Sequence, residues 1–415
     1  MSSLNKVNTH LIDYMIVGII GKPNVGKSTF FNAATLLNVP MASYPFTTVE
    51  PNFGVAYVTT KCVCKVLGVE DNPVNSRCID GTRLIPIKIV DVAGLVKGAA
   101  EGRGLGNKFL DNMRQADALT HVVDASGSTD EEGVITSEGS YSPLKDIEIV
   151  ENEFDLWLKQ ILQKDWQRVS RSVESDSTKA AEIFAERLSG LAIKEKHIHS
   201  AAEKIELALD KPTGWSDDDI LNFSRALREV SKPSVIAANK ADLPSAKENI
   251  EMIKATDRVV VPCAAEAELL LRRASDKKLI DYIPGSSTFK IPDSGNLNPA
   301  QLKALEMVQE NVLKIWGSTG VQQTINKAYL DLLEGIVVYP VEDEHKFSDK
   351  KGNILPDAYI LKQGSTAKDL AFAIHSELGE TFLYAVDAKT GMRLGADHIL
   401  KDSNVVKIVS TARRG

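Results

Sequence analysis

Apolar residues in the first third of the chain recur in runs of strand length, separated by loops and helical segments. Such runs cover 15–20, 84–90 and 118–124. The first run leads through a glycine-containing loop into a helical pattern over 29–34, and another helical pattern over 108–116 precedes the third run. Strands that alternate with helices are typical of an α/β fold. The sequence therefore predicts a mostly parallel sheet wrapped by helices.

The region before the second apolar run has a different pattern. Residues 42–54 carry two prolines and two glycine or asparagine breaks, which predict a loop. Residues 55–69 alternate apolar and polar side chains and are rich in residues that favour strands. Turn residues gather over 70–81. We therefore expect 55–69 and 84–90 to pair as a hairpin.

From residue 147 the apolar spacing changes to that of amphipathic helices. Apolar side chains recur three or four positions apart over 147–230. A stretch rich in glycine, serine, threonine and acidic residues, 126–142, precedes this block and marks a boundary. The pattern predicts an all-helical insertion at 147–231, whose apolar stripes form a core of its own.

The strand pattern resumes after the insertion. Strands are expected at 233–238 and 258–262, and helices at 266–282, 300–316 and 320–334. These elements read as the second part of the α/β unit.

The stretch from residue 335 has a third pattern. A strand is expected at 336–340, a turn-rich return at 347–355, a helix at 366–378 and a final strand at 405–408. Short strands around one helix predict a small β-grasp-like α+β domain.

Composition and charge narrow the classes of partner. The chain has 415 residues, 43% of them hydrophobic and 25% charged, and a net charge of −7. It is therefore not a polycation built for nucleic acid, and no DNA partner is expected. An RNA contact would need a local basic patch. Arg272-Arg273, Lys277-Lys278 and Arg413-Arg414 are short clusters that are more typical of solvated faces.

The N-terminus lacks the basic-then-apolar pattern of a signal sequence, and no apolar run reaches membrane-spanning length. The expectation is a cytoplasmic protein without a membrane partner. The sequence carries no signal for an oligomeric state.

The four cysteines are too few and too scattered for a disulfide framework. Cys62, Cys64 and Cys78 could in principle hold a metal, but no fourth ligand stands at a familiar spacing. We therefore expect these three and Cys263 to be reduced and mostly buried thiols.

Residues 21–28 read Gly-Lys-Pro-Asn-Val-Gly-Lys-Ser and stand between a predicted strand and a predicted helix. This is the context of a G-x-x-x-x-G-K-[ST] loop, whose backbone N–H groups cradle phosphates at a positive helix end. Lys27 is expected to reach the β- and γ-phosphates, and Ser28 to bind Mg²⁺. The expected nucleotide contacts in this loop are Asn24, Val25, Gly26, Lys27, Ser28 and Thr29. The chain is therefore predicted to bind a nucleotide.

Asp91 and Gly94 form a D-x-x-G motif where a predicted strand ends. Asp91 can hold Mg²⁺, in the simplest arrangement through a water, and the Gly94 N–H can sense the γ-phosphate. Thr47 or Thr48 can supply a second hydroxyl to Mg²⁺ and the γ-phosphate; we favour Thr48, and either can instead be a turn residue. Hydrolysis is thus assigned to Lys27, Thr48 and Gly94, and the metal to Ser28, Thr48 and Asp91.

A base-reading motif, Asn239-Lys240-Ala241-Asp242, follows the predicted strand at 233–238. The Asp242 carboxylate can accept two hydrogen bonds from the guanine N1–H and N2–H₂ groups. Adenine would leave this acceptor unpaired, at a cost of about 1–3 kcal/mol. The motif therefore predicts a preference for GTP over ATP. The alternative is a turn that starts a helix.

Leu95 follows the D-x-x-G motif, where Ras-like switches place a glutamine that orients water. A leucine cannot polarise water, so we expect slow intrinsic hydrolysis that depends on a partner or an extra cation. Asn24 is a candidate K⁺ ligand, and a structural asparagine of a tight loop is an equal alternative.

The chain resembles the Obg family of translation-factor-class GTPases through three segments, 21–29, 44–54 and 91–106. The order of its parts resembles the YchF or Obg-like ATPase branch, with a P-loop NTPase G domain at 1–146 and 232–334 and a helical insertion at 147–231. The remaining residues, 335–415, resemble a TGS domain through Val-Tyr-Pro at 338–340 and the segments 364–371 and 373–375.

This resemblance implies a Mg²⁺-dependent GTP-hydrolysing switch that associates with ribosomes or RNA. ATP-preferring members have an altered base-reading motif, whereas this chain keeps Asn-Lys-Ala-Asp and so resembles a GTP-preferring, archaeal-type relative. The last nucleotide motif is Cys263-Ala264-Ala265 in place of Ser-Ala-x, and the Ala264 N–H is expected to reach the guanine oxygen. Three alternatives stay open: an Obg-like ATPase, a kinase for a small substrate, and a scaffold that binds nucleotide without hydrolysis.

Overall fold

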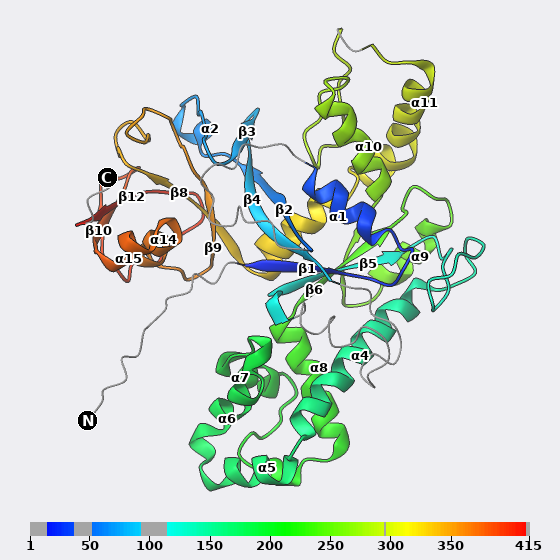
Figure 1. Cartoon of the computed structure of the whole chain (residues 1–415), viewed down its shortest axis with the longest axis vertical. Coiled ribbons are helices and arrows are strands. Elements are labelled where there is room, and N and C mark those ends of the chain that lie inside the picture. Colours follow the sequence, from blue (N-terminus) through cyan, green and yellow to red (C-terminus); the bar gives the residue numbers. More distant parts are fainter. Residues whose placement is uncertain (1–14, 37–51, 93–113, 294–295, 412–415) are drawn as a thin grey trace.

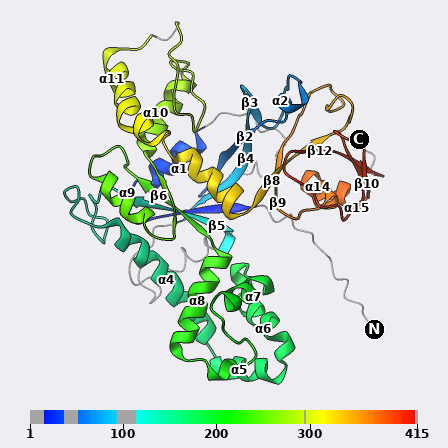
Figure 2. The ribbon, with the colours of Figure 1, turned by 180° about the vertical axis from the view of Figure 1, so that it is seen from behind.

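The computed structural model describes residues 15–36, 52–92, 114–293 and 296–411. In these residues the chain forms a central α/β unit, a helical unit and a C-terminal unit (Figure 1). The helical unit, in green, extends from one side of the central sheet. The C-terminal unit, in orange and red, lies beside the hairpin end of the sheet, and Figure 2 shows the same arrangement from behind. The expected fold class is confirmed.

The central sheet has seven strands. In chain order they are β1 (Ile16–Ile20), β2 (Phe53–Lys61), β3 (Arg77–Ile79), β4 (Thr82–Asp91), β5 (Ala118–Asp124), β6 (Ser234–Asn239) and β7 (Val259–Pro262). Their spatial order is β2-β4-β1-β5-β6-β7, and β3 pairs with β4. All pairs from β4 to β7 are parallel, whereas β2 and β3 run antiparallel to β4. The carboxyl ends of β1, β4, β5, β6 and β7 therefore meet at one edge, where open α/β sheets bind ligands.

Helices cover both faces of this sheet, which is why its central strands read as continuous apolar runs. The helices of the central unit are α1 (Lys27–Thr35), α2 (Cys64–Leu67), α9 (Ala246–Lys254), α10 (Ala265–Asp276), α11 (Pro299–Val308), η4 (Gln309–Leu313), α12 (Lys314–Trp316), α13 (Val321–Asn326) and η5 (Lys327–Leu332). On one face Phe30 of α1, Leu269 of α10 and Ile325 of α13 share a core with Val17 and Val235. On the other face α9 and the start of the helical unit pack on β5 and β6.

The helical unit has its own aromatic core. Its elements are α4 (Pro143–Gln163), α5 (Trp166–Ser175), η1 (Ser177–Lys179), α6 (Ala180–Arg187), η2 (Ser189–Leu191), α7 (Glu195–Lys204), η3 (Pro212–Gly214) and α8 (Asp217–Ser231). The fully buried ring of Phe184 contacts Trp166, Trp215 and Phe223, with centroids 5.6–6.1 Å away. α4 also reaches the central sheet, because Phe154 shares a core with Leu119. The helical unit is thus joined to the sheet by packing as well as by the chain.

The C-terminal unit is a five-stranded sheet with two helices on it. Its elements are β8 (Gly335–Val341), β9 (Tyr359–Lys362), α14 (Ala367–Ile374), α15 (Ser376–Glu380), β10 (Phe382–Asp387), β11 (Arg393–Leu394) and β12 (Asn404–Ser410). The strand order is β11-β10-β12-β8-β9, with β12 and β8 parallel at its centre. This is the expected β-grasp arrangement. It packs on the hairpin through a cluster in which Val337, Tyr339 and Leu355 contact Cys62 and Ile85.

Several local predictions are wrong. The predicted strand 55–69 ends at Lys61, and Cys64–Leu67 form a helical turn that closes at Gly68 in the left-handed region, with φ +66°. The predicted helix 366–378 is broken at His375, whose backbone is extended, so that α14 and α15 are separate. The helix expected over 266–282 ends at Asp276. Turn geometry sets these ends, and apolar spacing does not report it.

Two expected elements fall largely outside the described residues: the loop 42–54 and the helix 108–116. Among the helices of the described ranges, none is both long and apolar enough to cross a membrane.

Candidate functional site

The phosphate loop joins β1 to α1 at the ligand-binding edge of the sheet, and two of its glycines are sterically required. Gly26 has φ +90°, and a Cβ there would lie 2.2 Å from Nδ2 of Asn239. A Cβ on Gly21, at φ +156°, would lie 2.5 Å from the Val122 carbonyl oxygen. Neither position therefore has room for a side chain. The first turn of α1 carries no acidic residue, so its positive end stays available to an anion.

The structure brings Lys27 and Asp91 together. Lys27 is the first residue of α1 and Asp91 is the last residue of β4, and the Lys27 ammonium forms an ion pair with the Asp91 carboxylate. Both side chains remain partly accessible, at 15% and 28% exposure. The cation expected on the phosphates thus lies beside the carboxylate expected near the metal.

The donor set at this point suits Mg²⁺. Ser28 is exposed at the start of α1, and Asp91 supplies a carboxylate from the neighbouring strand. Hydroxyl and carboxylate oxygens are the hard ligands that Mg²⁺ prefers. In this structure the Asp91 carboxylate is paired with Lys27, so the two donors fit Mg²⁺ once the Lys27 ammonium moves to a phosphate.

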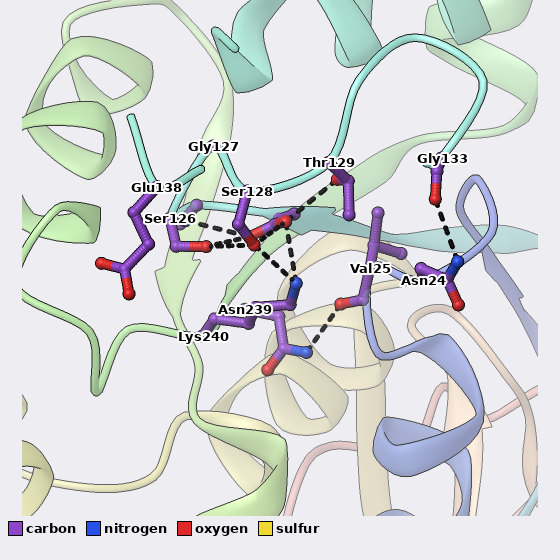
Figure 3. Close-up of polar contacts among 12 residues, drawn as sticks. Asn24, Val25, Ser126, Gly127, Ser128, Thr129, Gly133, Glu138, Asn239 and Lys240 are labelled. Carbon is purple, nitrogen blue, oxygen red and sulfur yellow. Dashed lines mark hydrogen bonds and ion pairs between the residues drawn. The ribbon is translucent and has the colours of Figure 1, made fainter. Parts of the chain in front are cut away.

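A segment that the sequence marked only as a boundary, 126–142, is part of the site. Asn24, at φ +62°, donates from Nδ2 to the Gly133 carbonyl at 2.9 Å. The buried Lys22 ammonium donates to the carbonyls of Thr129 and Asp130 at 3.0 and 2.6 Å and pairs with Asp146 at 2.7 Å. The phosphate loop is therefore fastened along one side by this segment. Figure 3 shows the segment arching over Asn24 and Val25.

The sequence leaves two roles open to Asn24, that of a K⁺ ligand and that of a structural residue of the loop. Its amide nitrogen has the structural role, because it holds Gly133. Binding of K⁺ by the Asn24 oxygen stays a prediction.

Asp124, at the end of β5, organises the same segment. Its carboxylate is buried and accepts hydrogen bonds from the hydroxyls of Ser126, Ser128 and Thr129 at 2.5, 2.9 and 2.9 Å. It also pairs with the Lys240 ammonium at 2.8 Å. Burial by itself raises the pKa of Asp124, but the hydrogen bonds from Lys240 and Ser126 outweigh it and leave this pKa below its ordinary value. Asp124 is therefore an ionised anchor.

Sequence reasoning missed Asp124, Lys22 and the serines. The available signal was a short run of Ser, Gly and Thr that begins two residues after an aspartate that ends a buried strand, at the same edge as the phosphate loop.

Asn239 connects two nucleotide motifs. Its Nδ2 donates to the Val25 carbonyl at 2.8 Å, and its Oδ1 accepts from the Ala265 N–H at 3.0 Å. The side chain is 4% exposed. Both of its polar ends are therefore used to hold the phosphate loop against the segment after β7.

Asp242 lies two residues beyond Lys240 and is partly exposed. Within the described ranges its carboxylate has no hydrogen-bond or ion-pair partner, so it is available to a base. The indole nitrogen of Trp316 donates to the neighbouring Ala241 carbonyl at 2.9 Å and supports this turn.

The Ala264 N–H, which is expected to reach the guanine oxygen, already has a partner in this structure. This N–H donates to the Thr319 carbonyl at 2.8 Å, so it is not free to meet a guanine oxygen. The reason is close packing of the loop before α13: a Cβ on Gly320 would lie 1.9 Å from the Pro262 carbonyl oxygen. Cys263 is buried, its Sγ lies 3.2 Å from Oγ1 of Thr324, and burial raises its pKa to about 12. The segment Cys263-Ala264-Ala265 is thus held by protein contacts.

Thr47, Thr48, Gly94 and Leu95 lie outside the described residues. Their assigned roles stay predictions.

Comparison with known protein families gives three matches along the chain. Residues 16–153 match the model described as 50S ribosome-binding GTPase. Residues 237–343 match Obg-like GTPase YGR210-like, G4 motif-containing domain, and residues 348–410 match the TGS domain.

Individual relatives cover most of the chain. A GTP-binding protein of Methanocaldococcus jannaschii is 50% identical over 96% of this chain and all of its own. The ribosome-binding ATPase YchF of Bacillus subtilis is 28% identical over 89% of this chain and 87% of its own. Among solved structures, a GTP-binding protein from Pyrococcus horikoshii superposes with a TM-score of 0.73 at 42% identity and covers 96% of this chain and all of its own. The YchF GTPase of Schizosaccharomyces pombe shares the fold, with a TM-score of 0.55 at 19% identity over 95% of this chain and 97% of its own.

Proposed function

Since the chain belongs to the YchF-like family of Obg-like P-loop GTPases with a C-terminal TGS domain, we propose that it is a Mg²⁺-dependent GTPase that switches a ribosomal or RNA contact. The observation that carries the proposal is the meeting of Lys27, Asp91 and the Asn239–Asp242 turn at one edge of the sheet. One nucleotide needs its phosphate, metal and base ligands at the same edge of the sheet.

In this proposal the N–H groups of residues 24–29 and the Lys27 ammonium hold the β- and γ-phosphates. Ser28, Asp91 and Thr48 hold Mg²⁺, which supplies charge neutralisation on the phosphate oxygens when bound. To leave room for it, Lys27 exchanges its Asp91 partner for a phosphate. The Gly94 N–H senses the γ-phosphate. With leucine at position 95, water has to be oriented by another group, so the isolated protein turns over slowly.

Guanine specificity rests on Asp242 in this proposal. The carboxylate is free to accept from N1–H and N2–H₂, while the Ala264 N–H is engaged by Thr319. Because the Ala264 N–H is bonded to Thr319, it does not donate to the guanine oxygen. This missing guanine contact supports a second candidate function, ATP hydrolysis. The name of the Bacillus subtilis relative, a ribosome-binding ATPase, points the same way.

Binding and single-turnover hydrolysis of GTP and ATP, with Mg²⁺ and either K⁺ or Na⁺, test this proposal. We expect GTP to bind at least tenfold more tightly than ATP. Lys27→Ala should lower single-turnover hydrolysis at least a hundredfold, because the phosphates lose their counter-charge. Unchanged hydrolysis in this variant would refute the site, and tighter binding of ATP would favour the second candidate.

The ribosomal contact needs its own test. The family description of residues 16–153 and the relative's name support it, although the net charge of −7 requires that any RNA contact be local. Co-sedimentation with ribosomes is expected with a non-hydrolysable GTP analogue and not with GDP. Equal co-sedimentation with the GTP analogue and with GDP would contradict a contact that the nucleotide switches.

A further inference from the structure

We propose that Cys62, Cys64, Cys78 and Asp71 form a tetrahedral binding site for Zn²⁺, remote from the nucleotide site. The three cysteines were expected to be ordinary buried thiols because no fourth ligand stood at a familiar spacing. The fold supplies that ligand: one donor atom from each of these four side chains lies within 4.8 Å of every other.

Local geometry explains the cluster. Cys62 follows β2, Cys64 begins α2, and Cys78 lies in the middle of β3. The single turn of α2 ends at Gly68 with φ +66°, where the Val69 N–H bonds back to the Cys64 carbonyl at 3.1 Å. This turn reverses the chain, and the following loop brings Asp71 onto the thiols. The Cys62 thiol lies 3.1 Å from Oδ2 of Asp71.

The separations suit zinc. Bond lengths of about 2.3 Å to sulfur and about 2.0 Å to oxygen place ligand atoms roughly 3.5–3.8 Å apart in a tetrahedron. The Cys64 and Cys78 sulfurs are 4.0 Å apart. The whole cluster, within 4.8 Å, needs side-chain shifts of about an ångström or less to close on one ion.

The donors select the class of metal. Three soft sulfur ligands disfavour Mg²⁺ and Ca²⁺, which take oxygen. A carboxylate in the fourth position departs from the four cysteines that iron–sulfur clusters take. A closed set of four protein ligands, with Cys62 and Cys64 buried, is typical of a structural zinc site.

Charge around the cluster supports the assignment. A zinc ion with three thiolates and one carboxylate is a net anion. The guanidinium of Arg83, which is fully buried, donates to Oδ2 of Asp71 at 2.8 Å. Through its second terminal nitrogen, Nη2, Arg83 donates to the Leu355 carbonyl at 2.5 Å. This buried cation offsets the charge and orients a ligand, as outer-shell partners of zinc sites do.

The position of the site gives it a structural role. The loop that carries Asp71 is bonded to the C-terminal unit: the Asn72 N–H donates to the Ile354 carbonyl at 3.1 Å, and the Val74 N–H donates to the Pro356 carbonyl at 2.8 Å. Zinc would fix this loop on the hairpin, and the loop with Arg83 would fix the TGS domain against the sheet.

The first test uses the full chain, purified under reducing conditions. Elemental analysis should find about one zinc per chain. After chelation, titration with Co²⁺ should give the thiolate-to-cobalt charge-transfer bands and the intense visible bands of a tetrahedral sulfur-rich site. Hydrogen exchange in residues 342–357 should be faster in the chelated protein. This measurement needs no variant.

Two serine variants provide a matched comparison. Cys78→Ser removes a ligand, whereas Cys263→Ser removes a buried thiol outside the cluster. We expect Cys78→Ser to retain at least tenfold less zinc after a chelator challenge, and Cys263→Ser to retain as much as the parent.

Three results would overturn the proposal: a parent protein with neither zinc nor a tetrahedral Co²⁺ spectrum, equal zinc in both variants, or a Cys64–Cys78 disulfide in the protein as isolated. The last would indicate a redox pair. Since the site is distant from the phosphate loop, GTP binding by the parent protein is scored separately, and its failure would not bear on the zinc.

Discussion

Replacement of Asn239 by alanine tests whether this residue shapes the phosphate loop. The side chain accepts from the Ala265 N–H and donates to the Val25 carbonyl, and both groups are buried. Asn239→Ala leaves this donor and this acceptor without partners. Each unsatisfied buried group costs about 1–3 kcal/mol, so the free energy of unfolding should fall by about 2–6 kcal/mol, less whatever water recovers.

Asn239→Ala should also weaken nucleotide binding. The Val25 carbonyl belongs to the loop whose N–H groups face the phosphates, and without Asn239 this loop has more conformations to lose on binding. We expect affinities for GTP and ATP to fall by the same factor, at least tenfold, which corresponds to about 1.4 kcal/mol. An equal factor is expected because both polar ends of Asn239 face protein, not a base.

Asn249→Ala is the matched control. This asparagine is also buried and donates to one backbone carbonyl, that of Ala125, at 2.8 Å, but it lies in α9 and does not touch the phosphate loop. Urea unfolding should show a loss in both variants, whereas equilibrium binding of a fluorescent nucleotide should change in Asn239→Ala and stay within about threefold in Asn249→Ala. Loss of GTP affinity without loss of ATP affinity would refute the reasoning, because Asn239 would then read the base.

Three further predictions concern specificity and stability. Asp242→Asn should lower the ratio of GTP to ATP affinity at least tenfold in competition binding; an unchanged ratio would mean that another group reads guanine. Asp155→Ala should lower the free energy of unfolding, measured in urea, by about 3–5 kcal/mol. The variant removes the carboxylate that lies 2.6 Å from the buried Arg228 guanidinium and joins α4 to α8. A loss below 1 kcal/mol would contradict this. Burial lowers the pKa of His121 to about 4, although the nearby Glu151 carboxylate acts to raise it. Between pH 6.5 and 4 the His121 imidazole therefore stays mostly neutral in the folded protein, whereas in the unfolded chain it takes up a proton. The free energy of unfolding is therefore highest well above pH 6.5 and falls as the pH falls toward 4, by about 1.6 kcal/mol between pH 6.5 and 5. His121→Gln should flatten that slope in pH-dependent unfolding, and an unchanged slope would assign the titration elsewhere.

The elements that the sequence placed correctly share one property: their pattern is local. The strand before residue 21, the helix after residue 26 and the motifs at Asp91 and Asn239 all follow from apolar runs and short spacings. Parallel pairing then brings strand ends to one edge, which is why the meeting of Lys27 with Asp91 could be expected.

Other features depended on contacts that spacing does not encode. The Ala264 N–H is taken by Thr319, more than fifty positions away. The anchoring of 126–142 by Asp124 needed the carboxyl end of β5 beside the phosphate loop. The Asp71 carboxylate lies within 4.8 Å of three cysteine sulfurs only because a single helical turn at 64–67 reverses the chain.

The sequence by itself therefore determined the fold class, the family and the nucleotide motifs, because the hydrophobic period and the glycines of a phosphate loop are imposed by backbone geometry within a few residues. The tertiary structure alone decided which hydrogen-bond donors remain free for a ligand. A buried polar group takes whichever partner the packing brings within about 3 Å, and in this chain those partners come from distant strands and loops.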